Sequence, residues 1–282
     1  MKIGIIGAGK VGCSMGKYLV EHGISVEGYY SLKKESVDSA ATFTGSRPYY
    51  VLHDLVSVSD ILFITTPDDC ISGVWEQIRN QLIQNKIICH FSGSLSSVVF
   101  SDCGQTGESA CSIHPMYAFS DKFTSYKNLK QAIFTMEGDR EALDTMRPLF
   151  ESMGNTVCVI KSENKRKYHA AASMVSNMMI GLYQMGIQML GECGFDELSA
   201  RRLIGPLVRG NVEKLLETSV EEALTGPIER ADADTVRKHL EVLSESERAV
   251  YVNLGKMLIG IASQKNPDRD YTAISNILMS DE

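Results

Sequence analysis

The chain has 282 residues, 44% of them hydrophobic and 22% charged, and a formal net charge of −7. This length and composition are those of a folded globular protein that can bury a sizeable core, and they exclude a disordered chain. The acidic balance, without a basic stripe, argues against a nucleic-acid-binding surface. Seven cysteines without a C-x-x-C pair favour a reducing cytoplasm. We expect neither a signal peptide nor a membrane span.

The first sixteen residues, MKIGIIGAGKVGCSMG, predict a buried strand over residues 2–6, a glycine turn and the start of a helix. The glycines follow the G-x-G-x-x-G spacing, which permits a tight turn, close approach of a pyrophosphate and close packing of the helix on the strand. The free N–H groups of the helix would face the phosphates. A glycine turn in a protein without a cofactor is the alternative. We predict a cofactor-binding loop formed by Gly7, Ala8, Gly9, Lys10, Val11 and Gly12.

The second predicted strand, residues 25–30, ends without the carboxylate that usually holds the ribose hydroxyls of NAD. Ser31 and Lys33 follow this strand instead, whereas the nearest acid, Glu27, lies inside it. Hydroxyl and ammonium groups are the donors that a 2′-phosphate requires, so we predict that the chain binds NADP(H). The alternative is that Lys33 is a solvated residue at the start of the next helix, 33–42.

Two later strands, 61–65 and 87–90, end in small polar residues. Ligands of a doubly wound sheet bind outside the carboxyl ends of its strands. The alternatives are a proline-stopped strand followed by an aspartate that caps the helix 71–81, and a serine turn that caps a short helix. We predict contacts of the cofactor with Thr66, Pro67 and Ser92, and of the substrate with Ser94.

A further strand, residues 109–113, delivers His114 to the same edge of the sheet. Reduction of a carbonyl by hydride leaves an alkoxide, which needs a proton or a strong hydrogen-bond donor, and histidine provides either near neutral pH. A structural histidine is the alternative. The strands 132–136 and 156–160 then close a first domain, for which we predict residues 1–161.

After the last predicted strand the β-branched runs stop, and residues 162–282 predict an all-helical domain. Its first helix, 164–193, carries His169, Ser173 and Asn177 at four-residue spacing, which places them on one face of an unbroken helix. This polar stripe predicts either the lining of a cleft, where the three residues act in catalysis, or a self-satisfied network in the core.

The remaining sequence predicts the helices 197–217, with a break at Gly205 and Pro206, 232–244, 246–264 and 270–280. In the charged loop before the second of them, Glu229 and Arg230 are candidate substrate ligands, although an ion-paired loop is the ordinary explanation. The apolar helix surface suggests burial against a second copy, so we expect a homodimer. No residue cluster has metal-ligand spacing, so we expect no metal.

The chain contains, in this order, the segments GAGKVG, YYSLKKES, ITTPDD, HFSGSLSS, SIHPM, KYHAAASMVSN and LTGPIER. This combination resembles the Rossmann-like oxidoreductases with a C-terminal helical domain of long-unassigned function, which are distant relatives of the 6-phosphogluconate and β-hydroxyacid dehydrogenases. The resemblance covers essentially the whole chain and implies a 6-phosphogluconate dehydrogenase-like C-terminal domain. Some members of the family are associated with pantothenate biosynthesis as an alternative type of ketopantoate reductase.

The wider superfamily implies which side chains act. Ketopantoate reductases of the better-known type carry a lysine followed by asparagines four and eight residues on. Alignment on Asn177 places Ser173 and His169 at the other two positions, so that histidine replaces lysine as the implied proton donor. The segment SIHPM is similar to the His-Pro-Met segment of prephenate dehydrogenases, which implies that His114 contacts the substrate.

We therefore predict an α/β protein with a doubly wound Rossmann sheet followed by an all-α C-terminal domain. Its predicted function is that of a cytoplasmic NADPH-dependent reductase of a small 2-oxo acid, with conversion of ketopantoate to pantoate as the leading reaction. One alternative is a dehydrogenase or imine reductase that acts on another small carboxylate, either prephenate-like or pyrroline-like. The other alternative is a sensor that binds NADPH without turning it over.

Overall fold

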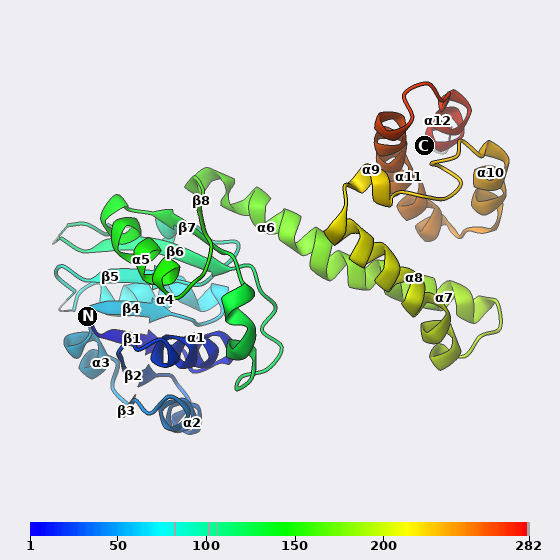
Figure 1. The fold of residues 1–282 in the computed structure, drawn as a ribbon. Helices are drawn as coiled ribbons and strands as arrows, with labels where there is room; N and C mark the ends of the chain where they lie inside the picture. Colours follow the sequence, from blue (N-terminus) through cyan, green and yellow to red (C-terminus); the bar gives the residue numbers. More distant parts are fainter. Residues whose placement is uncertain (82, 101, 106, 281–282) are drawn as a thin grey trace. The chain divides into compact units, whose positions relative to one another are not determined.

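The computed structural model describes residues 1–81, 83–100, 102–105 and 107–280, and the chain divides into two compact units, Met1–Ser176 and Asn177–Glu282 (Figure 1). The change from strands to helices comes where the sequence predicts it, after strand β8 (Val157–Val159). The division into units comes later in the chain, because side chains of helix α6 (Lys165–Ser173) are hydrogen-bonded to the sheet. The first helix after the strands is thus part of the sheet-containing unit.

The first unit is built on one sheet with the strand order β3-β2-β1-β4-β5-β6-β7-β8. Besides β8, its strands are β1 (Ile3–Ile6), β2 (Val26–Tyr30), β3 (Arg47–Tyr49), β4 (Ile61–Ile64), β5 (Ile87–His90), β6 (Ser109–Pro115) and β7 (Phe134–Gly138). Neighbouring strands are parallel except for β6 and β7. The strand order reverses between β1 and β4, which is the switch point where a doubly wound sheet binds ligands. The predicted α/β fold is confirmed.

Helices cover both faces of this sheet. They are α1 (Lys10–Glu21), α2 (Lys34–Thr44), α3 (Leu52–Val58), α4 (Asp68–Ile78) and α5 (Arg140–Ser152), with 3-10 turns η1 (Ser97–Val99), η2 (Ser125–Gln131) and η3 (Ser162–Asn164). Phe63 packs into one buried cluster with Leu19 of α1, whereas its neighbour Leu62 packs into a second cluster with Trp75 of α4. Alternate residues of a strand point to opposite faces, so a strand between two helical layers is apolar throughout.

Two expectations about these helices are wrong. Helix α4 begins at Asp68 rather than at residue 71, and Pro67, not an aspartate, is its N-cap residue. The helix starts early because proline fixes the backbone before it, and the carboxylate of Asp68 bonds to another loop instead of capping. The short helix α3 was not predicted, because its 7 residues are too few for a clear helical period.

The predicted long helix 164–193 is also not a regular α-helix. It consists of α6, a π-helical turn over Met174–Met178, and α7 (Met179–Glu192). A π-turn takes more residues than an α-turn, so it rotates the following side chains relative to the preceding ones. The four-residue steps from His169 to Ser173 and Asn177 therefore do not keep all three side chains on one face.

The second unit is helical. After α7 come α8 (Glu197–Glu217), α9 (Val220–Ala223), α10 (Ala233–Val242), α11 (Glu245–Lys265) and α12 (Thr272–Met279). The predicted break at Gly205 and Pro206 is wrong, since α8 continues through both; a long helix can lose the one hydrogen bond that proline removes. Asp232 caps α10 as expected, with its carboxylate accepting from the backbone N–H of Thr235 at 3.0 Å.

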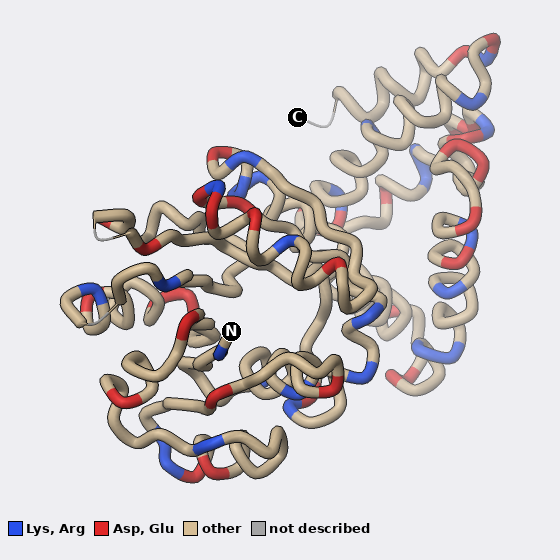
Figure 2. Tube along the Cα trace, turned by 60° about the vertical axis from the view of Figure 1, so that its left-hand side comes forward, with Lys and Arg blue, Asp and Glu red and all other residues tan. Residues whose placement is uncertain are grey.

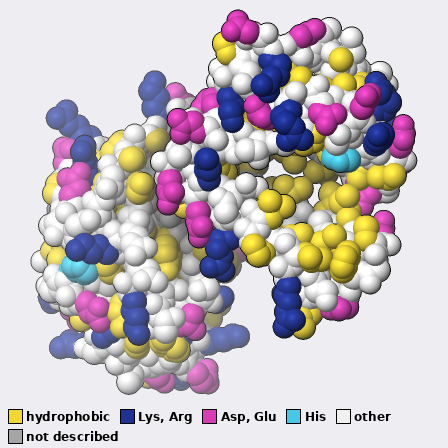
Figure 3. All heavy atoms as spheres, turned by 45° about the vertical axis from the view of Figure 1, so that its right-hand side comes forward, with side chains coloured by type: hydrophobic (Ala, Val, Ile, Leu, Met, Phe, Trp, Pro, Cys, Tyr) yellow, Lys and Arg dark blue, Asp and Glu magenta, His cyan; other side chains and the backbone are white. Residues whose placement is uncertain are grey.

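The helical unit has a small core and an apolar surface. Its buried cluster consists of Ile228, Val236, Leu240, Val252, Ile274 and Leu278. Large apolar side chains of α7 and α8 are exposed, among them Ile180, Leu182, Leu203 and Leu207, and Figure 3 shows hydrophobic side chains gathered on part of one face. Acidic and basic residues are interspersed along the chain in both units (Figure 2). Across the described residues, no helix combines the length and the apolar character needed to cross a bilayer.

Candidate active site

The glycine loop lies between β1 and α1. Gly7 has a φ of +113°, a conformation that side chains disfavour, and a Cβ on Gly12 would overlap the carbonyl oxygen of Gly7. These two glycines therefore make the tight turn and the close helix packing that the spacing predicts. Gly9 precedes the first residue of α1, and a Cβ built on it would meet no atom within 4 Å. Open space thus lies beside Gly9 at the start of α1, where a helix favours an anion.

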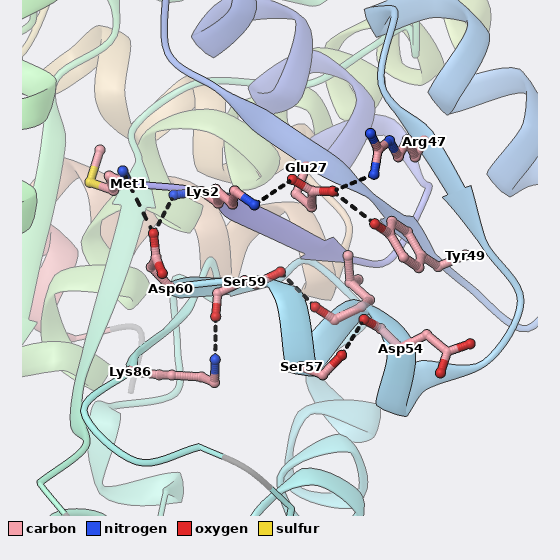
Figure 4. A network of polar contacts seen from close by, with 11 residues as sticks. Met1, Lys2, Glu27, Arg47, Tyr49, Asp54, Ser57, Ser59, Asp60 and Lys86 are labelled. Carbon is pink, nitrogen blue, oxygen red and sulfur yellow. Dashed lines mark hydrogen bonds and ion pairs between the residues drawn. The ribbon is translucent and has the colours of Figure 1, made fainter.

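The acidic residue of β2, Glu27, lies near the start of the strand rather than at its end, within a network of polar contacts (Figure 4). The carboxylate of Glu27 accepts a hydrogen bond from the Tyr49 hydroxyl at 2.8 Å and lies 3.4 Å from Arg47 and 3.8 Å from Lys2. The Glu27 carboxylate is therefore already paired with neighbouring side chains. Lys33 is exposed at the N-cap of α2, where its ammonium group is accessible to a phosphate.

Two loops at the carboxyl ends of β4 and β5 are joined by Asp68. Its Oδ2 atom accepts hydrogen bonds from the hydroxyls of Ser92 and Ser94, both at 2.7 Å. The Ser92 oxygen also accepts from the backbone N–H groups of Ser94 and Leu95, at 3.1 and 2.9 Å. Ser92 thus forms the serine turn that the sequence left open, and its hydroxyl is fully used within the loop. The Ser94 oxygen keeps acceptor capacity for a ligand.

Thr66 lies in the first of these loops. Its hydroxyl oxygen is buried and, within the part of the chain that the structure describes, has no hydrogen-bond partner. A buried hydroxyl without a partner is unfavourable by about 1–3 kcal/mol, and a bound ligand can satisfy it. The neighbouring Pro67 caps α4.

His114 and His169 converge on Gly93. A Cβ on Gly93 would overlap Nδ1 of His169 and lie 2.8 Å from Nε2 of His114, and the two imidazole rings lie 6.0 Å apart. Nδ1 of His169 is buried and has no hydrogen-bond partner among the described residues. The sequence offered these histidines as alternatives, but the structure places them side by side over the loop after β5.

Tyr168 and Lys165 complete this cluster, and the sequence analysis missed both. The Tyr168 hydroxyl lies 2.8 Å from Nδ1 of His114, and the Lys165 ammonium donates to the Ser112 hydroxyl at 2.6 Å. Lys165 is only 1% exposed. A lysine at a helix start reads as a solvated residue, but its position four residues before His169 was a signal, because it places Lys165 on the same helix face.

Burial governs the protonation of the cluster. It lowers the pKa of His114 to about 4, with the positive charges of Lys165 and His169 as further causes, so the ring is neutral at neutral pH. Burial also lowers the pKa of Lys165 to about 8 and raises the pKa of Tyr168. Lys165 remains mostly charged at pH 7.

A pocket of about 680 Å³ lies between the loop after β5 and the start of α6. Its polar lining consists of Ser94, Ser96, Ser162, Glu163, Lys165 and Arg166. The hydroxyl groups and the cationic side chains suit a ligand with acceptor oxygens, whereas Glu163 adds a negative charge. Such a pocket has the volume of a small-molecule site.

The remaining predicted residues lie away from this cluster in the chain. Ser173 is the last residue of α6, and Asn177 is exposed in the π-turn, at the start of the second unit. The Glu229 carboxylate accepts from Asn266 at 2.9 Å and from Arg269 at 3.0 Å, which is the ion-paired loop given as the ordinary explanation. Arg230 is exposed next to it. Roles of these four residues in the reaction remain predictions.

Among the described residues, no group of three or more His, Cys, Asp or Glu side chains could hold a metal ion. The seven cysteines are unpaired thiols.

Two family models each match part of the chain. A Rossmann-like domain model matches residues 1–115, and the model of a domain of unknown function, DUF2520, matches residues 132–258. A search of curated proteins returned no match.

Solved structures share the whole fold. Protein TM1727 from Thermotoga maritima is 25% identical with a TM-score of 0.75, over 93% of this chain and 99% of that chain. The BF3122 protein of Bacteroides fragilis is 20% identical with a TM-score of 0.71, over 92% and 98% of the two chains. Pyrroline carboxylate reductase from Plasmodium falciparum, solved with NADP bound, is 14% identical with a TM-score of 0.60, over 94% and 96%. These likenesses establish the fold over nearly the full length of the chain.

Proposed function

We propose that the chain is a Rossmann-type oxidoreductase with a C-terminal helical domain and that it acts as an NADPH-dependent reductase of a small 2-oxo acid, with ketopantoate as the leading substrate. One observation carries the proposal. His114 and His169 converge on Gly93, at the sheet edge that also bears the glycine loop. Two imidazole groups at this edge are what the reduction of a carbonyl needs beside a nicotinamide.

The residues present fit an NADP-type cofactor. The open space at Gly9 and the first turn of α1 suit the pyrophosphate, and Ser31 and Lys33 suit a 2′-phosphate. The buried Thr66 hydroxyl lacks a partner that a ligand at this edge would supply. When bound, NADPH supplies the hydride. The protein's task is then to hold the carbonyl carbon close to the nicotinamide and to stabilise the oxygen.

The histidines act on that oxygen. A hydrogen bond from a ring N–H of His114 polarises the carbonyl, and His169 delivers the proton that the developing alkoxide takes up. Ser94 helps to orient the substrate. Its hydroxyl hydrogen points to Asp68, so the Ser94 oxygen accepts a hydrogen bond from the ligand rather than donating one. The pocket of about 680 Å³ has the exposed Arg166 in its lining, which supports a substrate carrying a carboxylate.

A cyclic imine acid is the second candidate substrate. The carboxylate of Asp68 lies within 2.7 Å of the Ser94 hydroxyl, and a negative charge near the reacting centre would stabilise a protonated imine. The pyrroline carboxylate reductase from Plasmodium falciparum shares the fold. Asp68 is the residue that separates the two candidates, since a neutral carbonyl gains nothing from its charge.

The test is the rate of NADPH oxidation by the purified protein with ketopantoate, compared with NADH and with a panel of 2-oxo acids and pyrroline carboxylates. Rapid turnover with ketopantoate and NADPH supports the leading proposal. Turnover with pyrroline carboxylates alone, lost in Asp68→Asn, supports the second. NADPH binding by calorimetry without oxidation by any of these compounds would contradict both and leave a nucleotide sensor.

We also propose that the protein is a homodimer. The exposed apolar side chains of α7 and α8, among them Ile180, Leu182 and Leu207, support this assignment. Light scattering gives the mass directly, and Leu182→Glu with Leu207→Glu should halve it. A monomeric wild-type protein would contradict the proposal.

A further inference from the structure

We propose that Lys165 is a positioning residue of this site: its buried ammonium group ties the first turn of α6 to β6 and acts together with burial to hold the His114 ring in its neutral form, with its single N–H directed at Gly93. The histidine then acts as a neutral hydrogen-bond donor, as imidazole does in enzymes that polarise a carbonyl without protonating it. The catalytic role of His114 rests on the proposed function, but the arrangement of Lys165, Tyr168 and His114 does not.

Lys165 is held on several sides in the interior. Its ammonium donates to Ser112 of β6 at 2.6 Å and lies 5.8 Å from the centre of the Tyr168 ring. The side chain of Glu137 from β7, also 1% exposed, supplies the opposing charge. A buried lysine is strongly unfavourable unless such groups surround it.

Glu137 in turn ties the loops that flank the pocket. Its carboxylate accepts from the backbone N–H and the hydroxyl of Ser97, at 2.8 and 2.9 Å, and from the hydroxyl of Ser162 at 2.6 Å. Ser97 begins η1 and Ser162 begins η3. Four elements therefore depend on this pair of charges: β6, β7, η1 and the η3–α6 connection.

The charged groups that act on His114 lie on α6 and α4. Lys165 and His169 on α6 lower the pKa of its ring, in addition to burial, and Asp68 on α4 opposes them weakly. Thr135 is its partner residue on β7. Of the two positive charges, that of Lys165 is the larger cause. Lys165 is thus the group whose removal should most readily allow the His114 ring to take up a proton.

The hydrogen bond from Tyr168 fixes the tautomer. The Tyr168 hydroxyl lies 2.8 Å from Nδ1 of His114 and 3.9 Å from the Sδ atom of Met116. Because the imidazole nitrogen is the nearer and the stronger acceptor, we infer that the hydroxyl donates to Nδ1. The remaining hydrogen of the neutral ring sits on Nε2, the nitrogen that faces Gly93.

The first experiment is nitrogen NMR of the full-length protein with labelled histidines, without substrate, because ring nitrogen shifts distinguish the charged ring and both neutral tautomers. The chain has six histidines, and the spectrum of His114→Gln assigns the signal of His114. We expect the neutral form with hydrogen on Nε2 from pH 8 down to pH 5.5. A wild-type His114 that becomes charged near pH 6.5, or that carries its hydrogen on Nδ1, would overturn the proposal without any variant of Lys165.

The second experiment compares Lys165→Met with Lys167→Met, which removes an exposed lysine from the same helix. In Lys165→Met the midpoint of the His114 titration should rise by about one pH unit, whereas in Lys167→Met it should stay at the wild-type value. Lys165→Arg, which keeps the charge, should restore the low midpoint. A Lys165→Met protein that is folded and leaves the midpoint unchanged would refute the role of Lys165.

These outcomes separate the inference from the proposed function. If NADPH oxidation is absent with every substrate but the His114 titration behaves as expected, the proposed function fails and the role of Lys165 stands. If turnover is found but the titration does not respond to Lys165, the reverse holds.

Discussion

The two units of the chain differ in where charged and apolar side chains lie: the first buries charged residues, whereas the second exposes large apolar ones. In the first unit, Lys165 and Glu137 are each 1% exposed and are held by hydrogen bonds from several elements. In the second, Arg269 and Glu229 pair with side chains 38% and 14% exposed, and apolar residues of α7 and α8 such as Ile180 face outward. In a sheet covered on both faces, strands, loops and helices can all supply hydrogen-bond partners to a buried charged side chain. A small group of helices supplies fewer such partners. Chemistry that depends on shifted protonation therefore belongs to the sheet-containing unit.

The largest expected effect is on turnover, from the two histidines of the first unit. His114→Gln and His169→Ala remove groups that act on the carbonyl oxygen, so each should lower kcat by about 10²–10⁴-fold. NADPH affinity, measured by calorimetry, should change little. His239→Ala, a histidine of the second unit, is the matched control. Near-native rates in both first-unit variants would place the proton donor elsewhere.

The loop between the histidines should be nearly as sensitive. Gly93→Ala introduces a Cβ that overlaps His169 and lies 2.8 Å from His114, so both rings must move and kcat should fall by about 10²-fold. Gly73→Ala in α4 is the control, because a Cβ there meets no atom within 4 Å. That control should raise the free energy of unfolding by about 0.5–1 kcal/mol. Equal activity of the two variants would show that the histidines do not act at Gly93.

Cofactor preference should depend on the end of β2. Lys33→Ala with Ser31→Asp removes an ammonium group and adds a carboxylate, which should weaken NADPH binding by about 10–100-fold relative to NADH. Lys34→Ala is the control, since the Lys34 ammonium lies 5.4 Å from the centre of the Tyr50 ring. Titration calorimetry with both cofactors measures the ratio. An unchanged ratio would mean that Lys33 is the solvated residue of the alternative interpretation.

Acid should destabilise the first unit through its buried histidines. Burial lowers the pKa of both His90 and His114 from 6.5 to about 4. Between these two pH values the unfolded chain therefore binds protons at both rings, whereas the folded chain does not. The resulting stability is fully present above pH 6.5 and is lost as the pH falls towards 4, on the order of 2–3 kcal/mol for each ring. Urea unfolding at pH 7 and pH 4.5 should therefore show a smaller loss in His114→Gln than in the wild type. An equal loss would mean that His114 is charged in the folded protein.

Much of the fold could be read from local sequence patterns. A short apolar run marks the strand before the glycine turn, and backbone geometry explains the roles of Gly7 and Gly12. The missing acid at the end of β2 is visible directly in the sequence. Each of these features depends only on residues that are neighbours in the chain. The misread elements are those where a local signal was weak or misleading. Pro206 does not end α8, α3 is too short for a period, and the π-turn at Met174–Met178 has no marker in the sequence.

The site itself was only half predictable. Sequence alone identified His114, His169, Ser94 and the glycine loop as candidates, because motifs and strand ends mark them. Tertiary structure decided that both histidines meet at Gly93, that Asp68 takes the hydroxyl hydrogens of Ser92 and Ser94, and that Lys165 is buried. The contacts of Lys165 with Ser112 and of Tyr168 with His114 span 53 and 54 residues of chain. Burial and pairing over such separations arise from packing, which fixes protonation and hydrogen-bond direction and which no local pattern contains.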